Sequence, residues 1–418
     1  MKFKKEQFIS HRTILSNLSY MSLLQIFLLL APLITYPYLV RILGKELYGA
    51  VLTAQMLVSY ASVLIDFGSN DVCAKHVSLN RDNQQELSKI VNSVIVLRLI
   101  IWTICFFIYA AIVYAVPAYN DYFLLFILSY GMSCNEMLFP QFFFQGIERM
   151  KYITVVSIST KVIFIILIFF LVKNAGDYLL VPVLYSIGYL FGGVISLHVV
   201  YRKLGLSFFF PSKKDMIYYF KDSSAIFSTN LISTIKDKIN YLLVGSYLGM
   251  SSVVVYDLGY KLLVILSKPS NILATVMLPN LAKSKNVVAL KKTIIISFLI
   301  TSFCVFVANI FMSDIVSFFI GNRDDIDILP IRLFTIVPMI LSISVIICND
   351  YFIAFGYNKF ALYSIIITTC GYLIVLGLLL MENYLSSVYS FILLSIFAYM
   401  IELLYRLFIL IKASKRNG

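Results

Sequence analysis

The chain has 418 residues, of which 60% are hydrophobic and 13% are charged, and its mean hydropathy is +0.90. A soluble domain is about 45–50% apolar and about 25% charged, so the composition excludes an ordinary soluble protein. The net charge of +13 raises the question of a nucleic-acid partner, but the Lys and Arg residues gather at the ends of apolar segments. We therefore predict an all-α integral membrane protein.

Twelve apolar segments are long enough to cross a hydrocarbon core of about 30 Å as helices of about 20 residues. In chain order they are residues 13–38, 47–69, 90–116, 122–146, 153–173, 178–201, 222–247, 252–275, 292–313, 328–353, 361–381 and 385–409. The first has no small-residue cleavage site after a short apolar core, so we interpret it as a retained span rather than a signal peptide.

Basic residues are distributed unevenly over the connecting loops. If the N-terminus is cytoplasmic, the inward segments hold 23 Lys and Arg residues and the outward segments hold 5. Loops on the cytoplasmic side of a membrane are enriched in Lys and Arg. The distribution predicts an even number of spans and cytoplasmic termini, and it explains the net charge without a nucleic-acid partner.

A weak internal repeat favours two halves of six spans. FQGIERM (Phe144 to Met150) resembles AFGYNKF (Ala354 to Phe360), which aligns Gly146 with Gly356, and an LG pair recurs at Leu43-Gly44 and Leu248-Gly249. Parallel repeats of this kind are common in transporters. We expect an N-terminal lobe over residues 1–210 and a C-terminal lobe over 211–418, joined by the basic loop 203–221.

Charged residues inside the predicted spans are the strongest functional signal. Each Lys, Arg or Asp at the centre of a membrane helix costs about 2.5–3.5 kcal/mol on insertion scales, so such groups usually face a protein interior or a watery cavity. In the first eight spans the cations are Arg98, Lys161, Lys236, Lys238, Lys261 and Lys268, and the anions are Asp66, Glu136, Asp237 and Asp257. This excess predicts a cationic interior.

The seventh span, residues 222–247, places its charges on a polar face. At about 100° per residue, Lys236, Asp237 and Asn240 share one arc with other polar residues, and Lys238 falls at the edge of the apolar side. In the eighth span, Asp257 and Lys261 are spaced to pair. Asp66, Asp237 and Asp257 are candidates either for structural ion pairs or for coupling to H+ or Na+.

Several chemistries have no support in the residues. The six cysteines form no C-x-x-C pair, and the three histidines are far apart. We find no nucleotide-binding glycine loop, no H-E-x-x-H motif and no nucleophile triad. The sequence predicts no metal, no cofactor and no enzymatic activity.

Four segments resemble a known transporter family. They are PYLVRILGKELYG (37–49), LIDFGSNDVCAK (64–75), FFFQGIERMKYI (142–153) and DKINYLLVGSYLGMSSVVVYDLGYKL (237–262). Their order is similar to that in the polysaccharide-transporter branch of the multidrug/oligosaccharidyl-lipid/polysaccharide (MOP) exporter superfamily. The likeness is greatest to Wzx-type flippases of O-antigen and capsule repeat units, and the last two spans add little to it beyond topology.

The resemblance implies a multi-pass protein of the bacterial inner membrane with two six-helix lobes around a central cationic cavity. Such proteins move a polyprenyl-diphosphate-linked oligosaccharide from the cytoplasmic to the periplasmic leaflet by alternating access, and polysaccharide polymerase machinery is a candidate partner. Position within the spans assigns substrate binding here to Lys236, Lys261, Arg98, Lys161 and Asn240. We expect Lys236 and Lys261 to hold the diphosphate or acidic sugars, and Arg98 and Lys161 to guide entry from the cytoplasm.

Three alternatives remain at this point. A multidrug exporter of the same superfamily would need an acidic, aromatic cavity for organic cations. A membrane-embedded polysaccharide polymerase or ligase would need a large outer loop, whereas the longest outward loop, about 313–330, is short. A scaffold without transport activity would leave the intramembrane charges unexplained.

Overall fold

The computed structural model describes residues 2–321, 327–382 and 384–414, and every regular element in these ranges is a helix. Ten helices are long and apolar enough to cross a membrane. One of them covers residues 16–79 and contains the first two predicted spans. The seventh predicted span is also helical, but its charges keep it outside the ten. The prediction of an all-α, multi-pass membrane protein is confirmed.

The chain forms two compact units, which divide between Thr234 and Ile235. This division falls inside the long helix α9, further along the chain than the predicted boundary at 210/211. Unit 1 contains α1 (Lys2–Asp66), α2 (Ser69–Leu79), α3 (Gln84–Ala115), η1 (Pro117–Tyr122), α4 (Phe123–Ser129), η2 (Tyr130–Ser133), α5 (Cys134–Leu138), α6 (Gln141–Gly146), α7 (Met150–Leu171), η3 (Ala175–Leu179), α8 (Leu180–His198), η4 (Val199–Lys203) and the first part of α9 (Lys213–Leu248).

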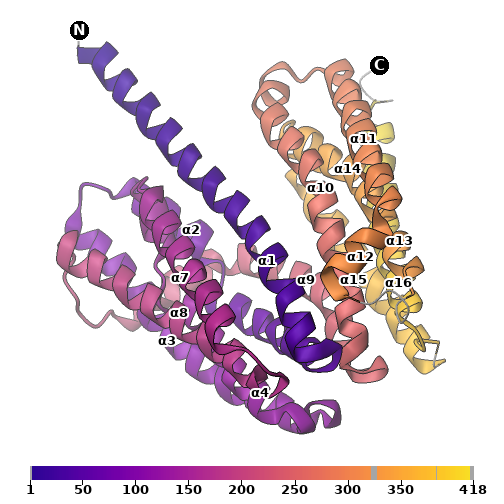
Figure 1. Ribbon diagram of the computed structural model, residues 1–418. Coiled ribbons are helices and arrows are strands. Elements are labelled where there is room, and N and C mark those ends of the chain that lie inside the picture. The colour runs from indigo at the N-terminus through magenta and orange to yellow at the C-terminus, as the bar shows by residue number, and fades with distance from the viewer. Residues whose placement is uncertain (1, 322–326, 383, 415–418) are drawn as a thin grey trace. The chain divides into compact units, whose positions relative to one another are not determined.

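Unit 2 contains the remainder of α9 and the helices that follow it. These are α10 (Met250–Ser284), α11 (Val287–Ile310), α12 (Met312–Ile320), α13 (Leu329–Phe334), α14 (Ile336–Ile346), η5 (Ile347–Ile353), α15 (Asn358–Met381) and α16 (Val388–Ser414). Within this unit α10 packs against α11 and α14, and α15 packs against α16 (Figure 1).

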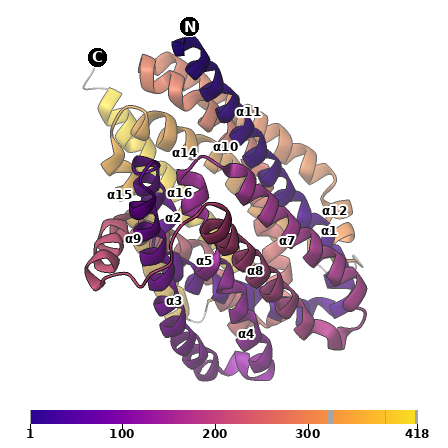
Figure 2. The same ribbon diagram turned by 90° about the vertical axis from the view of Figure 1, so that its left-hand side faces the viewer.

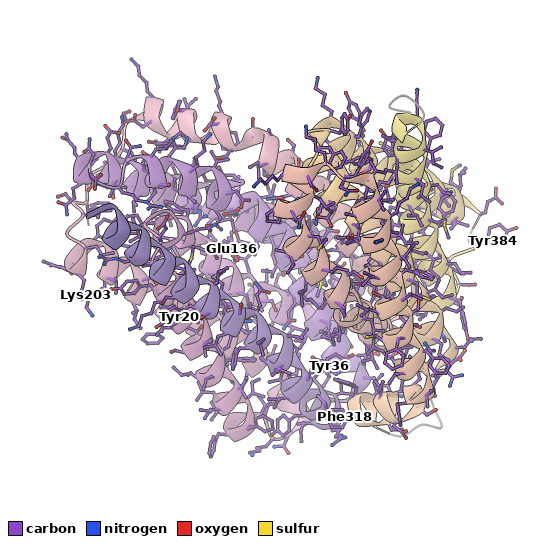
Figure 3. The ribbon with its side chains drawn as sticks, turned by 90° about the horizontal axis from the view of Figure 1, so that it is seen from above. Tyr20, Tyr36, Glu136, Lys203, Phe318 and Tyr384 are labelled. Carbon is purple, nitrogen blue, oxygen red and sulfur yellow. The ribbon has the colours of Figure 1, made fainter. Side chains whose placement is uncertain are left out.

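Equivalent glycines turn the chain after the first span of each half. Gly44 has φ 77° and ψ 168°, and Gly249 has φ 87° and ψ 159°. Residues with a Cβ are strongly disfavoured in this region, which explains why both LG pairs end in glycine. Across the first turn, the buried ring of Tyr36 (labelled in Figure 3) meets that of Tyr48 edge-on, with centroids 5.1 Å apart.

The second repeated motif is also a turn, but its register differs from the sequence match. The residue with positive φ is Glu148 (57°) in the first copy and Gly356 (87°) in the second. The matching turns are therefore shifted by two residues from the predicted pairing of Gly146 with Gly356. Gly146 has a different role, because a Cβ on it would lie 2.5 Å from the Cβ of Val77 on α2.

The helices around the polar interior of unit 1 are α1, α7 and α8, with short pieces between α4 and α6. Figure 2 shows α7 running beside α1, and the hydroxyl of Thr154 donates to the carbonyl of Tyr20 at 3.0 Å. The fourth predicted span is broken at Pro140, which has no N–H to continue a helix. The break exposes side chains from α5 and α6 to the space beside α7.

Candidate functional site

Unit 1 contains a polar cavity of about 270 Å³ at the depth of its membrane helices. Its walls come from α1, the α5–α6 break, α7 and α8. The polar side chains in the lining are Gln25, Asn135, Gln141, Ser157, Thr160, Lys161 and Tyr189. Amides, hydroxyls and one ammonium can donate hydrogen bonds to phosphate and sugar oxygens.

Lys161 is the only basic residue among those that line this cavity. Its side chain is half-buried, and it forms no hydrogen bond or ion pair with the residues that the structure describes. An ammonium group away from bulk water is unfavourable unless an anion or water compensates it. Ser157 lines the cavity one turn before Lys161 on α7, whereas Thr154 packs against α1.

Arg98 has a different environment from Lys161, although both were predicted to contact the substrate. Arg98 is fully buried on α3, and its guanidinium donates to Asp66 at 2.5 Å, to Ser69 at 2.6 and 3.0 Å, to Asn70 at 3.1 Å and to the carbonyl of Phe139 at 3.1 Å. These contacts tie α3 to the turn after α1 and to the α5–α6 break. The geometry favours a structural role for Arg98 and Asp66.

Glu136 is the other acidic group near this region of unit 1, and Figure 3 labels it. Its carboxylate accepts hydrogen bonds from Ser62 at 3.1 Å and from Asn135 at 3.0 Å. The carboxylate thus engages neutral donors on α1 and α5. It does not line the cavity that contains Lys161.

In unit 2, Lys236 belongs to a buried ion network between α9 and α16. Its Nζ lies 3.1 Å from Oε2 of Glu402 and 3.8 Å from Oδ1 of Asp237, and it lies 4.9 Å from the centre of the Tyr399 ring. The Glu402 carboxylate also forms an ion pair with Arg406 at 2.7 Å. The side chain of Lys236 is 11% exposed and that of Glu402 is 7% exposed.

Asn240 is one turn further along α9 and is almost fully buried. Its amide nitrogen donates to Tyr256 at 3.0 Å and to Ser395 at 2.9 Å, and its oxygen accepts from the hydroxyl of Tyr372. The polar arc predicted for α9 thus faces α10, α15 and α16. The engaged amide of Asn240 favours a structural role over substrate binding.

The predicted pair between Asp257 and Lys261 forms on α10. Asp257 is buried and also accepts a hydrogen bond from the hydroxyl of Tyr241 at 3.0 Å. Lys238 lies over the rings of Tyr241 and Tyr260, at 5.6 and 5.1 Å from their centres. An ammonium group over the face of an aromatic ring makes a cation–π contact, and Lys238 makes two of them.

Unit 2 also contains a small cavity beside the charged groups of α9. Its volume is about 10 Å³, and Lys236, Asp237 and several tyrosines line it. A space of this size holds about one water molecule, so it leaves no room for a sugar or a phosphate in this conformation. In the conformation described, the cavity of unit 1 offers the space for a ligand and the site of unit 2 is filled by its own ion pairs.

The sequence interpretation missed Glu402 and Arg406. The last span was used only for topology, and Arg406 was counted among the basic residues of the inner surface. Arg406 is instead 4% exposed within α16. The i,i+4 spacing of Glu402 and Arg406, on the same helical face as Ser395 and Tyr399, was a readable signal for this network.

This helical architecture is that of MOP-type transporters. A solved structure described as the inward-facing conformation of a multidrug resistance MATE family transporter of the MOP superfamily matches with a TM-score of 0.65 and 13% identity, over 93% of this chain and 96% of that one. A Vibrio cholerae MATE transporter matches with a TM-score of 0.59 and 14% identity, over 97% of each chain. At these identities the likeness establishes the fold alone.

The sequence relatives identify the family. The family described as "Polysaccharide biosynthesis protein" matches residues 14–285, which is more than half of the chain, so this protein belongs to that family. A protein of Escherichia coli (strain K12) named "Putative O-antigen transporter" is 23% identical over 358 residues, 82% of this chain and 84% of that protein. A Shigella dysenteriae protein of the same name is 26% identical over 233 residues, 56% of this chain and 58% of that protein. The predicted resemblance is confirmed.

Proposed function

We propose that this protein is a flippase that moves polyprenyl-diphosphate-linked oligosaccharide repeat units from the cytoplasmic to the periplasmic leaflet of the bacterial inner membrane. The observation that carries the proposal is the cavity of unit 1, in which Lys161 has no anionic partner among the residues that the structure describes and is surrounded by amides and hydroxyls. An anionic, hydroxyl-rich cargo supplies the missing negative charge and many hydrogen-bonding oxygens. The family membership and the names of the relatives agree with this class of cargo.

The mechanism follows from the chemistry of the cargo. A diphosphate cannot cross hydrocarbon while exposed, and Lys161 offsets its charge with charge-assisted hydrogen bonds. The polyprenyl tail stays in the bilayer while the head group passes along the polar lining. Alternating access then requires that the helices rearrange so that the same groups open to each leaflet in turn.

The candidate residues take different roles in this proposal. Lys161 contacts the diphosphate first, and Lys236 and Lys261 contact it only after they exchange their present carboxylate partners. Arg98 with Asp66, and Asn240 with its tyrosines, hold helices in place. This transfer breaks no covalent bond in the cargo, so it requires no enzymatic step.

A multidrug exporter is the competing function, because the solved MOP structures include a multidrug transporter. Organic cations require an uncompensated anion in the cavity, whereas the charged side chain among the described lining residues of the unit 1 cavity is the cation Lys161. The test uses purified protein in liposomes that contain either a fluorescent polyprenyl-diphosphate oligosaccharide or a cationic dye. Movement of the oligosaccharide to the opposite leaflet supports the flippase. Dye export without oligosaccharide movement contradicts it.

A further inference from the structure

Glu402 lies between two cations that differ in how firmly they are held. Its Oε1 forms an ion pair with Nη2 of Arg406 at 2.7 Å, and its Oε2 accepts a hydrogen bond from Nζ of Lys236 at 3.1 Å. Arg406 also donates to the carbonyl and hydroxyl of Ser344, at 3.0 and 2.9 Å, and to the hydroxyl of Ser364, at 3.1 and 3.2 Å. The guanidinium is therefore fixed by three residues from three helices.

Lys236 is held on one side only. Apart from Glu402, it lies near Asp237, whose Oδ1 is 3.8 Å away and so beyond hydrogen-bond distance, and near the face of the Tyr399 ring. The ammonium is carried on a flexible four-carbon stem and lines the small cavity of unit 2. If the pair opens, Lys236 is the partner that moves, and Glu402 remains bound to Arg406.

We propose that Glu402 is an internal counter-ion that occupies Lys236 while no cargo is bound and releases it to a phosphate of the cargo. The inference rests on the proposed function, since it assigns Lys236 to a phosphate-bearing substrate. A carboxylate and a phosphate offer the ammonium equivalent oxygen acceptors, so the two compete for it. Glu402 does not touch the cargo and acts through Lys236 as a positioning residue.

The arrangement has a physical advantage over a free lysine. A buried carboxylate that loses its only cation is strongly unfavourable, but Glu402 keeps Arg406 when Lys236 leaves. The exchange therefore leaves no isolated buried charge on either side. Return of Lys236 to Glu402 then favours release of the phosphate, so the carboxylate sets how tightly the cargo is held.

The direction in which one substitution changes the Kd for a diphosphate separates this role from a merely structural one. Glu402→Gln keeps the shape of the side chain and an oxygen for Arg406, but it removes the charge that competes for Lys236. The proposal predicts tighter binding of a diphosphate. If Glu402 only stabilises the fold and Lys236 never meets the cargo, the substitution lowers the stability of the protein but leaves the Kd unchanged or higher.

The experiment measures binding of farnesyl diphosphate to the purified full chain in detergent by calorimetry. We expect Glu402→Gln to lower the Kd about tenfold, which corresponds to a modest coupling between charged groups. The gain should disappear in the Lys236→Gln/Glu402→Gln double variant. Glu382→Gln is the control for the loss of one carboxylate, since Glu382 is exposed at the end of α15, and it should leave the Kd unchanged.

An unchanged or higher Kd for a folded Glu402→Gln variant overturns the inference. If that variant does not fold, Glu402→Asp retains the charge for Arg406 but draws it back from Lys236, and the Kd should again fall; an unchanged Kd refutes the idea. Transport by the unsubstituted protein is scored separately in liposomes. Failure of that transport contradicts the proposed function, whereas transport with no effect at Glu402 contradicts the counter-ion alone.

Discussion

Membrane-embedded cations in this protein have distinct environments that their residue type alone does not reveal. Arg98 has four protein partners, Lys236 has a carboxylate, and Lys161 has none among the described side chains. A buried cation with full partners stabilises contacts between helices, while one without partners is available to a ligand. The environment, rather than the depth in the span, separates structural from functional candidates.

Replacement of Arg98 by alanine should reduce stability more than it reduces transport per folded molecule. The change leaves Asp66 and the carbonyl of Phe139 without their donor, and breaking a buried pair in this way costs about 3–5 kcal/mol. Thermal unfolding in detergent measures the loss. Lys75→Ala on α2 is the control, because Lys75 is exposed. Normal stability with abolished transport would indicate that Arg98 contacts the cargo instead.

The sequence predicted which residues are charged within the membrane, but only part of their pairing. Asp257 and Lys261 were predictable as a pair because both lie on one helix at i,i+4. The Lys236–Glu402 pair joins two residues that are 166 positions apart in the chain, and no local spacing encodes that contact. The burial of Arg98 likewise depends on a break at Pro140 that brings the carbonyl of Phe139 to it.

At the scale of elements, the membrane helices were predictable because long apolar segments have few alternatives to a membrane helix. The positions at which these helices are interrupted were harder to predict. The fourth span consists of several short helices, and the tenth ends in a π-helix over Ile347–Ile353. The turns at Gly44 and Gly249 were visible as a repeated LG pair, since glycine is needed where φ is positive.

Alanine at Gly44 or Gly249 should destabilise the protein by about 1–3 kcal/mol, because a Cβ strains the backbone in this conformation. Gly377→Ala in α15 is a matched control, in which the new Cβ also meets no atom within 4 Å but the backbone is helical. Alanine is favoured over glycine in a helix by about 1 kcal/mol, so the control should be neutral or stabilising. Equal effects at the three positions, measured by thermal unfolding, would contradict the strained-turn interpretation.

For the whole molecule, the distribution of basic residues predicts the orientation in the membrane. The turn between α10 and α11 should face the cytoplasm, and that between α7 and α8 should face the periplasm. Ser284 and Ala175 are exposed at these two places. In a chain whose native cysteines are replaced by alanine, Ala175→Cys should react with an impermeant maleimide in intact cells and Ser284→Cys only after lysis. The reverse labelling pattern would contradict the predicted orientation of the protein and, with it, the proposed direction of transport.

The central claim concerns Lys161 and the cavity of unit 1. The most direct measurement compares the unsubstituted protein with Lys161→Gln and Lys151→Gln in liposomes that carry a fluorescent polyprenyl-diphosphate oligosaccharide. Both lysines belong to α7, but Lys151 is exposed at the start of the helix, so it controls for the loss of one positive charge. We expect Lys161→Gln to slow transfer at least about tenfold, as expected when an ion pair of about 1.4 kcal/mol or more is lost, while Lys151→Gln transfers normally. Equal transfer by all three proteins, each shown to be folded, would contradict the account.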